Sequence, residues 1–407
     1  MSSVRERRKG EPIRVTHVTT VPASLRFLRG QPDFARARGF ELRAVSSPGA
    51  ELDAFGESER VQVFPVEMAR RITPLADLVT LVRLISHFRA TQPDIVHAHT
   101  PKGGLLGVIA ATAARVPVRI YHMRGLPLMG ASGLKRGLLI GTERVSCLLA
   151  DEVFCVSHSL RGAALDLSLG RADQLRVLAG GSGQGVDTDR RFSPTRLGPQ
   201  ARSASRAALG MPEGALVFGF VGRIVRDKGL HELARAWARV RAELPEARLL
   251  IVGPLEPHDP VDPDIWSALA SDARVHRVGF TEDTPQLYAA MDVVVLPSYR
   301  EGFPNVPLEA ASMGKPVITT RVPGCVDAVL EDVTGLIVEP REHTGLAEAM
   351  LRYGREPHLR ETHGAAGRKR VLREFRREVI WGAIVERYRA LLNRAETVHE
   401  AEERARG

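Results

Sequence analysis

Short apolar runs alternate with longer helical segments along most of this chain, and that alternation constrains the fold more than any other feature. Apolar runs bounded by turn residues predict strands, and segments with a helical repeat of apolar positions predict helices. Strands that alternate with helices are joined by right-handed crossovers, which produce a parallel sheet covered by helices. The sequence therefore predicts an α/β fold.

The predicted strands form two series. The first series covers residues 13–20, 40–47, 61–66, 94–100, 118–123, 153–157 and 175–179. The second covers residues 216–221, 248–252, 275–280, 293–297, 317–320 and 335–338. Helices are predicted between most of these strands, for example at 74–90 and 105–114. Because 407 residues are too many for one ordinary core, each series predicts its own Rossmann-like, doubly wound domain.

The alternation lapses between the two series, where Gly, Ser, Pro and Arg dominate. This lapse predicts an N-terminal domain over 1–185, a linker over 186–206 and a C-terminal domain over 207–373. The remaining segment, 374–396, predicts a long helix with one apolar stripe, and its periodicity leaves open which domain it covers. Ligands of doubly wound sheets bind at the carboxyl ends of the strands, so we expect the site in a cleft between the domains.

The composition narrows the possible partners. The formal net charge of +9 is compatible with nucleic acid, anionic lipid or a phosphorylated substrate, or simply with a solvated arginine-rich surface. Aromatic residues make up 5% of the chain and form no base-stacking motif, which disfavours nucleic acid. The sequence shows neither a transmembrane run nor the apolar segment of a signal peptide. Three cysteines without Cys-x-x-Cys spacing favour a reducing, cytoplasmic setting over disulfides or a zinc ribbon.

Residues 296–310 carry the densest chemical signal. A predicted strand ends there, a loop follows, and a helix is expected to begin with Asn305 as its N-cap and Pro307 in its first turn. The N–H groups of such a helix end suit a diphosphate. The carboxylates of Glu301 and Glu309 suit sugar hydroxyls, which donate hydrogen bonds to them. Alternatively, Glu301 is solvated and Glu309 only complements its helix dipole.

The second signal is a strand, tight turn and helix over residues 216–229. Arg223 and Lys228 flank this turn, where fixed cations can neutralise a departing diphosphate. The Gly-Lys-Ser/Thr ending of a P-loop is absent. Two ordinary surface cations beside a turn are the alternative.

The third signal lies at the ends of the predicted strands 94–100 and 118–123. We expect His97 and His99 on opposite faces of their strand, and therefore no metal ion shared between them. His97 is expected in the core, whereas His99 is a candidate for the cleft. Lys102 follows at the start of a predicted helix, and His122 and Arg124 end the next strand in the same way.

In their order and spacing these motifs resemble the family-4 glycosyltransferases of the GT-B fold, in which two Rossmann-like domains face a central cleft. The matching positions are Ser157-His-Ser159, Gly185-Val186-Asp187, Gly222-Arg223, Lys228-Gly229, and the Glu-x7-Glu pair Glu301 and Glu309. No Gly-x-Gly-x-x-Gly follows the first strand, which argues against interpreting the chain as a nicotinamide-dependent dehydrogenase. Asp187-Thr-Asp189 matches the metal-binding Asp-x-Asp of the other glycosyltransferase fold but lies outside a central strand, so we interpret it as turn and cap chemistry.

The resemblance implies a retaining transferase that uses a nucleotide sugar and needs no metal or other cofactor. It implies that Arg223 and Lys228 hold the donor diphosphate, that Glu301 contacts the donor sugar, and that these three are catalytic. It implies that Glu309 binds the ribose. The remaining expected donor-binding residues are Gly222, Gly302, Phe303, Pro304, Asn305 and Val306. In this fold the C-terminal helix usually crosses back to the first domain.

Residues 97–104, 119–127 and 299–305 are similar to bacterial transferases of capsule, exopolysaccharide and O-antigen assembly. This similarity implies a UDP-linked N-acetylated hexosamine or related amino-sugar donor and an undecaprenyl-diphosphate-linked acceptor. It also implies a cytoplasmic protein bound peripherally to the anionic inner face of the membrane. We expect acceptor or cleft contacts from His99, Lys102, His122 and Arg124. Where many relatives of the wider family have His-Gly, this chain has Arg124-Gly125, so no general base is assigned.

One helix and the function itself leave alternatives open. The predicted helix over 132–149 is amphipathic and basic, which suits either a membrane surface or docking on its own sheet. A soluble acceptor, a UDP-sugar epimerase and a catalytically silent nucleotide-binding partner are the competing functions.

Overall fold

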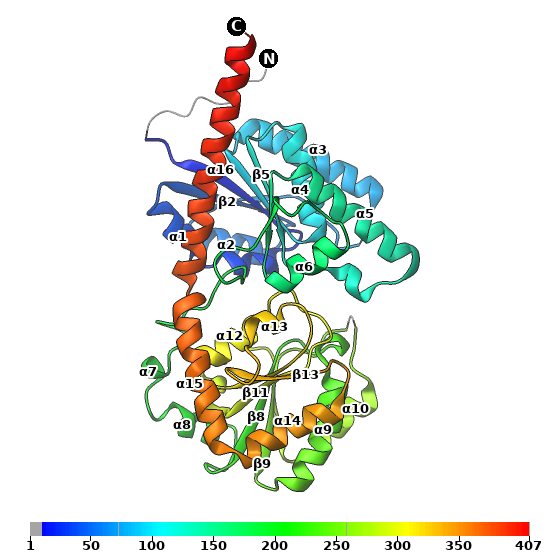
Figure 1. The fold of residues 1–407 in the computed structure, drawn as a ribbon, viewed down its shortest axis with the longest axis vertical. Helices are drawn as coiled ribbons and strands as arrows, with labels where there is room; N and C mark the ends of the chain where they lie inside the picture. The colour runs from blue at the N-terminus through cyan, green and yellow to red at the C-terminus, as the bar shows by residue number, and fades with distance from the viewer. Residues whose placement is uncertain (1–9, 72, 258, 407) are drawn as a thin grey trace. The chain divides into compact units, whose positions relative to one another are not determined.

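The computed structural model of this chain describes residues 10–71, 73–257 and 259–406, and it contains two compact α/β units (Figure 1). Unit 1 comprises Met1–Gln184 and Glu378–Gly407, and unit 2 comprises Gly185–Arg377. The segment 186–206, expected as a linker, lies in unit 2 and includes α7 (Pro194–Leu197) and the start of α8 (Ala201–Ala208). None of the helices among the described residues is long and apolar enough to cross a bilayer.

Unit 1 is built on a parallel sheet with the strand order β3-β2-β1-β4-β5-β6-β7. Its strands are β1 (Ile13–Val18), β2 (Phe40–Ser46), β3 (Gln62–Pro65), β4 (Ile95–His99), β5 (Val118–Met123), β6 (Glu152–Cys155) and β7 (Leu175–Arg176). Its helices before residue 170 are α1 (Gln31–Arg36), α2 (Ala50–Glu59), α3 (Pro74–Thr91), α4 (Pro101–Ala113), α5 (Gly133–Leu149) and α6 (His158–Asp166). The strand order reverses between β1 and β4, and such reversal points are where doubly wound sheets bind ligands.

Unit 2 is built on a second parallel sheet, with the order β10-β9-β8-β11-β12-β13. Its strands are β8 (Leu216–Val221), β9 (Ala247–Val252), β10 (Val275–Val278), β11 (Val293–Leu296), β12 (Val317–Thr320) and β13 (Gly335–Val338). Its other helices are α9 (Leu230–Glu243), α10 (Pro263–Ser271), α11 (Thr284–Ala290), α12 (Asn305–Ser312), α13 (Cys325–Ala328), α14 (His343–Arg355) and α15 (Pro357–Glu374). Here the order reverses between β8 and β11.

The two doubly wound parallel sheets confirm the predicted fold class, and each predicted strand is present with ends that differ by a few residues. The helix expected near Asn305 does begin there, but the predicted N-cap was wrong. Asn305 is the first residue of α12, and its N-cap is Pro304, which offers no side-chain acceptor. The predicted helix at 105–114 begins earlier, at Pro101 in α4, because proline is favoured in a first helical turn.

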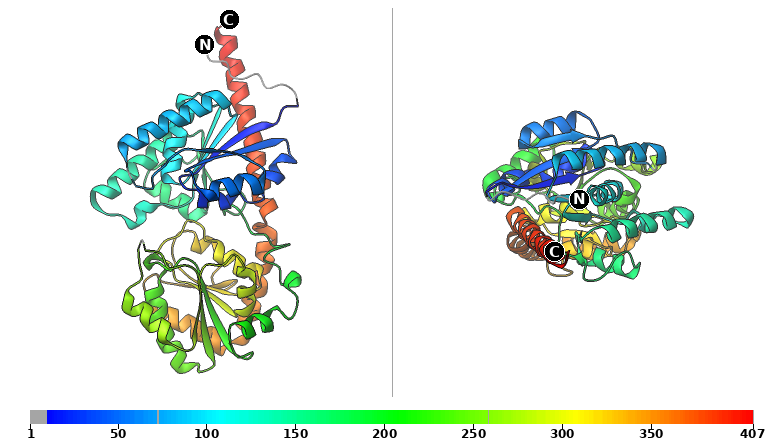
Figure 2. Two further views of the ribbon diagram at one scale, coloured as in Figure 1. Left: turned by 180° about the vertical axis from the view of Figure 1, so that it is seen from behind. Right: turned by 90° about the horizontal axis from the view of Figure 1, so that it is seen from above.

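The C-terminal helix α16 (Arg377–Arg406) packs on the sheet of unit 1. Its predicted apolar stripe is buried there, with Ile384 and Tyr388 in one cluster with Val15 and Phe40. The opposite face of the sheet carries α4, since Gly107 of that helix lies against the side chains of Ala98 and Val18. Figure 2 shows α16 along one side of unit 1 with α3 and α5 on the other. The alternation of side chains along β1 and β4 therefore separates an α16 face from an α4 face.

The packing of α16 predicts a large stability effect at Ile384. Ile384→Ala removes a buried side chain from the unit 1 core and should cost about 2–5 kcal/mol of unfolding free energy. Arg394→Ala, at an exposed position of the same helix, should change it by less than about 0.5 kcal/mol. Urea denaturation of both variants checks this expectation, and equal midpoints for the two would contradict the packing of α16 on this sheet.

Candidate active site

Two loops meet at the carboxyl edge of the unit 2 sheet, one after β8 and one after β11. These strands are parallel neighbours at the reversal of strand order, so both loops emerge at the same point. Tyr299 N–H donates to Asp227 O across the two loops at 2.8 Å. Gly229 has φ +72°, and a Cβ there would overlap the carbonyl oxygen of Pro297. A glycine in left-handed conformation is therefore what permits this close approach.

Lys228 and Glu301 form an ion pair that joins these loops. Lys228 Nζ contacts Glu301 Oε1, and both side chains are mostly buried. Ser298 Oγ donates to the same carboxylate oxygen at 2.8 Å. The pair is neutral as a whole, but it fixes the position of the Lys228 ammonium at the edge of the sheet, and a second hydrogen bond orients its carboxylate. The structure thus brings together two of the three residues expected to be catalytic.

Glu309 lies one turn into α12 and is oriented from a neighbouring helix. The hydroxyl of Tyr288, in α11, donates to Glu309 Oε2 at 3.0 Å. Burial and the nearby Glu309 charge raise the pKa of Tyr288 well above its usual range, so the phenol stays a donor. The hydrogen bond from Tyr288 therefore fixes the orientation of the Glu309 carboxylate at the start of α12.

The remaining expected donor residues surround the two loops. Arg223 follows β8 and is exposed, and its side chain makes no hydrogen bond or ion pair with the residues that the structure describes. Gly222 lies against Gly253, where a Cβ would overlap the Gly222 carbonyl oxygen. Gly302 is approached in the same way by Gly324.

The start of α12 completes this region. Phe303 packs against Phe375 with ring centroids 5.5 Å apart. Pro304, Asn305 and Val306 form the N-cap and the first helical positions. The N–H groups of this first turn have no carbonyl partner within the helix and can bind an anion.

In unit 1, four histidines gather at the corresponding reversal of strand order. His17 in β1 lies beside His97 in β4, and His99 lies beside His122 in β5. All four are buried. The expectation that His97 and His99 face opposite sides was wrong: their rings stack with centroids 4.2 Å apart. Residues two apart in a strand share a face, so the period of two requires this result.

Arg124 sets the proton positions in part of this cluster. Its Nε–H donates to His99 Nδ1 at 3.2 Å, and His99 Nε2 lies 2.9 Å from His17 Nδ1. A guanidinium can only donate, so neutral His99 must carry its proton on Nε2 and donate to His17. His17 then carries its own proton on Nε2, an atom that has no hydrogen-bond partner among the residues that the structure describes.

A second hydrogen-bonded chain runs from α16 into the same cluster. Tyr388 OH lies 2.5 Å from His97 Nδ1, and His97 Nε2 lies 3.1 Å from His122 Nδ1. Burial lowers the pKa of His97, His99 and His122 well below its usual value, and burial with the Arg124 charge lowers the pKa of His17 to about 3. The cluster is therefore neutral at physiological pH.

The nitrogens of His17, His97 and His99 lie within 4.8 Å of one another, close enough to consider a shared metal ion. A metal bound to His99 Nε2 would require the proton on Nδ1, which already faces the Arg124 donor. The guanidinium charge would also oppose a cation held by neutral ligands. The observed hydrogen bonds therefore argue against a metal ion at His99.

Of the expected acceptor residues, His99 and His122 are in this buried cluster, whereas Arg124 is half-buried beside it. Arg124 lies over the ring of Phe27, 4.3 Å from the centroid, and donates to Gly183 O at 3.3 Å. No carboxylate pairs with it in the part of the chain that the structure describes. Lys102 has a different environment, since it pairs with Asp77 at 2.6 Å. Arg124 is thus the acceptor-side candidate with an unneutralised charge.

Several residues of these two regions were not predicted from the sequence. Ser298 and Tyr288 orient the two glutamates, and His17 completes the histidine cluster. His17 ends a predicted strand just as His99 does, and the known strand order of doubly wound sheets could have placed the two side by side. The Asp187 interpretation as a cap agrees with its hydrogen bond from Arg190 N–H at 3.0 Å.

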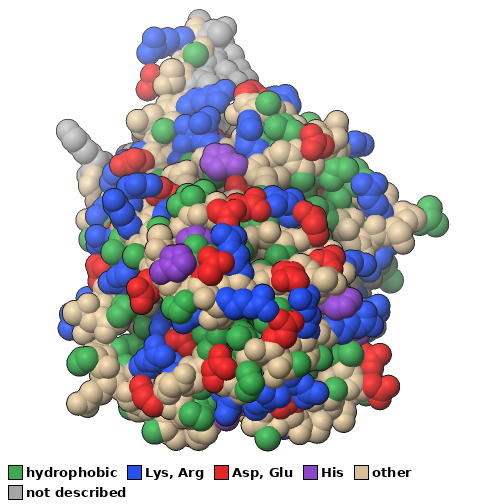
Figure 3. Space-filling model, turned by 60° about the horizontal axis from the view of Figure 1, so that its bottom comes forward, with side chains coloured by type: hydrophobic (Ala, Val, Ile, Leu, Met, Phe, Trp, Pro, Cys, Tyr) green, Lys and Arg blue, Asp and Glu red, His purple; other side chains and the backbone are tan. Residues whose placement is uncertain are grey.

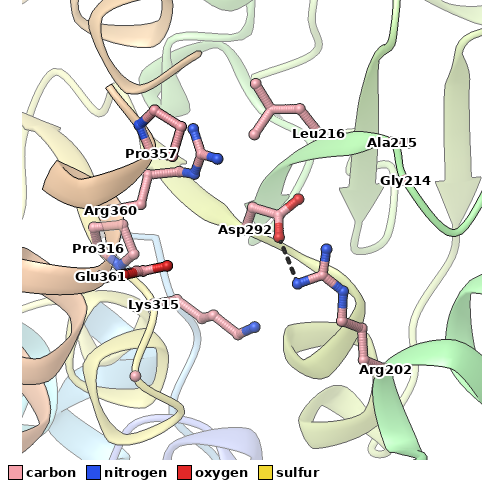
Figure 4. Close-up of a pocket in the computed structure, with 11 residues that line it drawn as sticks. Arg202, Gly214, Ala215, Leu216, Asp292, Lys315, Pro316, Pro357, Arg360 and Glu361 are labelled. Atoms are coloured by element: carbon pink, nitrogen blue, oxygen red, sulfur yellow. Dashed lines mark ion pairs between the residues drawn. The ribbon is translucent and has the colours of Figure 1, made fainter. Parts of the chain in front are cut away.

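A separate cavity of about 280 Å³ lies at the amino ends of the unit 2 strands (Figure 4). Asp292 pairs with Arg202 at 3.0 Å at its wall, and it also pairs with Arg206 at 2.8 Å. The Lys315 side chain points into the same hollow, and burial lowers the pKa of Lys315 to about 8. The cavity opens at the opposite end of the strands from Lys228 and Glu301, so it is not part of the donor region.

The histidine cluster predicts acid sensitivity of unit 1. Below about pH 6.5 the unfolded chain protonates these histidines while the folded chain does not, so stability falls by up to about 1.4 kcal/mol per pH unit for each histidine. His17→Asn should therefore lose less stability than the wild type between about pH 7.5 and pH 5. Thermal midpoints measure the difference, with His358→Asn at an exposed position as control. An unchanged pH dependence in His17→Asn would contradict the neutral cluster.

Family models match both halves of the chain. One described as a glycosyl transferase 4-like domain matches residues 34–181, and one described as glycosyl transferases group 1 matches residues 215–355. The capsular polysaccharide biosynthesis glycosyltransferase CapM of Staphylococcus aureus is 34% identical over 383 residues, which cover 94% of this chain and 98% of CapM. A D-inositol 3-phosphate glycosyltransferase of Kribbella flavida is 30% identical over 312 residues, covering 72% of this chain and 71% of that protein.

Solved structures agree on the fold. Anabaena HepE in complex with UDP-glucose superimposes with a TM-score of 0.77 at 22% identity, covering 93% of this chain and all of HepE. WaaG, a glycosyltransferase involved in lipopolysaccharide biosynthesis, superimposes with a TM-score of 0.70 at 15% identity, over 92% of this chain and 98% of WaaG. With two doubly wound parallel sheets and a relative aligned over nearly its full length, this chain belongs to the group 1, or family-4, glycosyltransferases of the GT-B fold.

Proposed function

We propose that this glycosyltransferase moves a sugar from a UDP-linked donor to a lipid-linked acceptor in capsule-type polysaccharide assembly, with retention and without a metal. The donor proposed is a UDP-N-acetylated hexosamine or a related amino sugar, and the acceptor an undecaprenyl-diphosphate-linked glycan. The near full-length similarity to CapM supports the pathway class, and the UDP-glucose complex of HepE supports the nucleotide.

The observation that carries this proposal is the ion pair between Lys228 and Glu301. When the bond from the sugar to the diphosphate breaks, negative charge grows on the departing phosphate oxygens. Lys228 is held in place by Glu301, whose carboxylate accepts a hydrogen bond from Ser298, and it supplies a cation that needs no reorganisation at that moment. The unpaired Arg223 adds a second cation from the same loop. Together they would perform the charge neutralisation that a metal ion supplies in other transferases.

The neighbouring groups suit the rest of a nucleotide sugar. The first turn of α12 offers N–H donors to a phosphate, and Glu309 offers acceptors to the paired hydroxyls of a ribose. Glu301 has a second carboxylate oxygen for a hydroxyl of the sugar. In unit 1, Arg124 would contact a charged part of the acceptor. Because such an acceptor is located at an anionic membrane surface, we also propose that the protein binds this surface peripherally.

A soluble acceptor is the second candidate, favoured by the similarity to D-inositol 3-phosphate glycosyltransferases. The two candidates share the donor chemistry described above. Transfer to a lipid-linked glycan in detergent supports the first, whereas transfer only to soluble sugar phosphates supports the second. Conversion of the UDP-sugar to its epimer without any acceptor would instead indicate an epimerase.

Two substitutions test the donor site. Lys228→Ala removes the fixed cation and Glu309→Ala removes the ribose acceptor, so each should lower kcat/KM for sugar transfer by about 100-fold or more. Lys369→Ala, at an exposed position of α15, is the control and should retain wild-type turnover. Near-normal transfer by either site variant would remove the proposed donor contacts.

Chelation tests the proposed role of the cations. Because Arg223 and Lys228 would neutralise the diphosphate, transfer should continue at the full rate in excess EDTA. Comparing the transfer rate in EDTA with the rate in added Mg²⁺ or Mn²⁺ tests this expectation. A strict requirement for either ion would overturn this mechanism while leaving the fold assignment intact.

A further inference from the structure

Two helices of unit 1 turn leucine and valine side chains to solvent. On α5, Leu134 is 96% exposed, Leu148 is 79% exposed and Leu138 is 50% exposed. On α3, Leu75 is 84% exposed, with Leu78, Val79 and Val82 close to 60%. Isolated exposed leucines are ordinary, but clusters of them mark interaction sites. We call these side chains together the α3–α5 surface.

The two helices lie on the same face of the sheet. α4 packs against α3 on one side and against α5 on the other, and α4 covers the face opposite α16. Figures 1 and 2 show α3 and α5 on the side of unit 1 away from α16. Residues 133–138 of α5 are all exposed, and the first buried residue of this helix is Glu143. The start of α5 therefore projects beyond the sheet that its later turns cover.

The exposed charged side chains on these two helices are all basic. The exposed charged residues of α5 are Lys135, Arg136 and Arg144, and its one acidic residue, Glu143, is buried against Tyr121 at 2.8 Å. On α3 the exposed Arg83 and Arg89 are basic, and the one carboxylate, Asp77, is neutralised by Lys102. Basic and acidic side chains are instead interspersed on the face drawn in Figure 3.

We propose that the α3–α5 surface binds an anionic phospholipid bilayer. Leucine and valine side chains would enter the boundary between headgroups and acyl chains, while lysine and arginine contact the phosphates. The proposal rests on the proposed function, because a lipid-linked acceptor is presented at such a surface. It identifies the part of this chain that makes the contact, including α3, which the sequence did not single out.

A second copy of the chain fits this surface less well than a bilayer. In a two-fold dimer the same patch meets itself, so Lys135 and Arg136 would approach their own counterparts without exposed carboxylates on either helix to pair with them. Like charges in a desolvated interface repel each other. A negatively charged lipid surface satisfies the apolar and the basic side chains together.

Vesicle co-sedimentation of the full chain tests the proposal. Wild-type protein should bind vesicles of phosphatidylcholine with about one third phosphatidylglycerol, and bind pure phosphatidylcholine at least about tenfold more weakly. Lys135→Glu with Arg136→Glu, and separately Leu134→Ser with Leu138→Ser, should each weaken binding to the anionic vesicles by about tenfold or more. Leu75→Ser with Val79→Ser tests the contribution of α3 in the same way.

The control variants are matched in chemistry but lie in unit 2. Lys369→Glu reverses an exposed charge and Phe280→Ser removes an aromatic side chain that is 71% exposed, and both should bind vesicles like the wild type. Thermal midpoints equal to that of the wild type show that each variant is folded.

Two outcomes would overturn the proposal. One is vesicle binding that is absent in the wild type or unchanged in the α3 and α5 variants. The other is a wild-type dimer in analytical ultracentrifugation that Leu134→Ser with Leu138→Ser converts to monomer, which would assign the surface to a second copy. Sugar transfer to a lipid-linked acceptor in detergent needs no bilayer, so it reports separately whether the proposed function itself fails.

Discussion

The pairing of β8 with β11 is the constraint on which the donor region depends. The chain first builds β8, β9 and β10 outward and then returns to place β11 on the free side of β8. That reversal brings the Lys228 loop and the Glu301 loop to one edge, although the two residues are 73 positions apart. Gly229 allows the loops to touch, and the hydrogen bond from Tyr299 N–H to Asp227 O keeps them together. The ion pair is neutral as a whole, but it gives the Lys228 ammonium a position that does not depend on its flexible side chain alone.

The same topological rule acts in unit 1 with different chemistry. The reversal between β1 and β4 gathers neutral histidines rather than an ion pair, and Arg124 orders the protons of two of them. Their neutrality follows from burial, because charging several imidazoles close to one another and to a guanidinium is costly. The edge of the unit 2 sheet therefore presents a lysine held by a glutamate. The edge of the unit 1 sheet presents a hydrogen-bonded histidine cluster beside a half-buried arginine.

Part of the surplus of basic residues lies on two helices of unit 1. On α3 and α5 the exposed charges are basic and lie among exposed leucines and valines, whereas the few carboxylates of these helices are buried or paired. A net charge alone is compatible with several partners, but its combination with apolar side chains on one face of a sheet is specific to an amphipathic surface.

Much of this architecture was determined by the sequence alone, because the period of apolar positions and the turn residues are local properties. The two series of strands and the motifs around Lys228 and Glu301 needed no structure. Only the tertiary structure showed which side chains bond across this topology, His17 with His99 across 82 positions and Lys228 with Glu301 across 73. It also decided that α16 covers the sheet of unit 1 and that the leucines of α5 face outward. Periodicity shows that a helix has an apolar face, but only packing against other elements determines which apolar side chains remain in solvent.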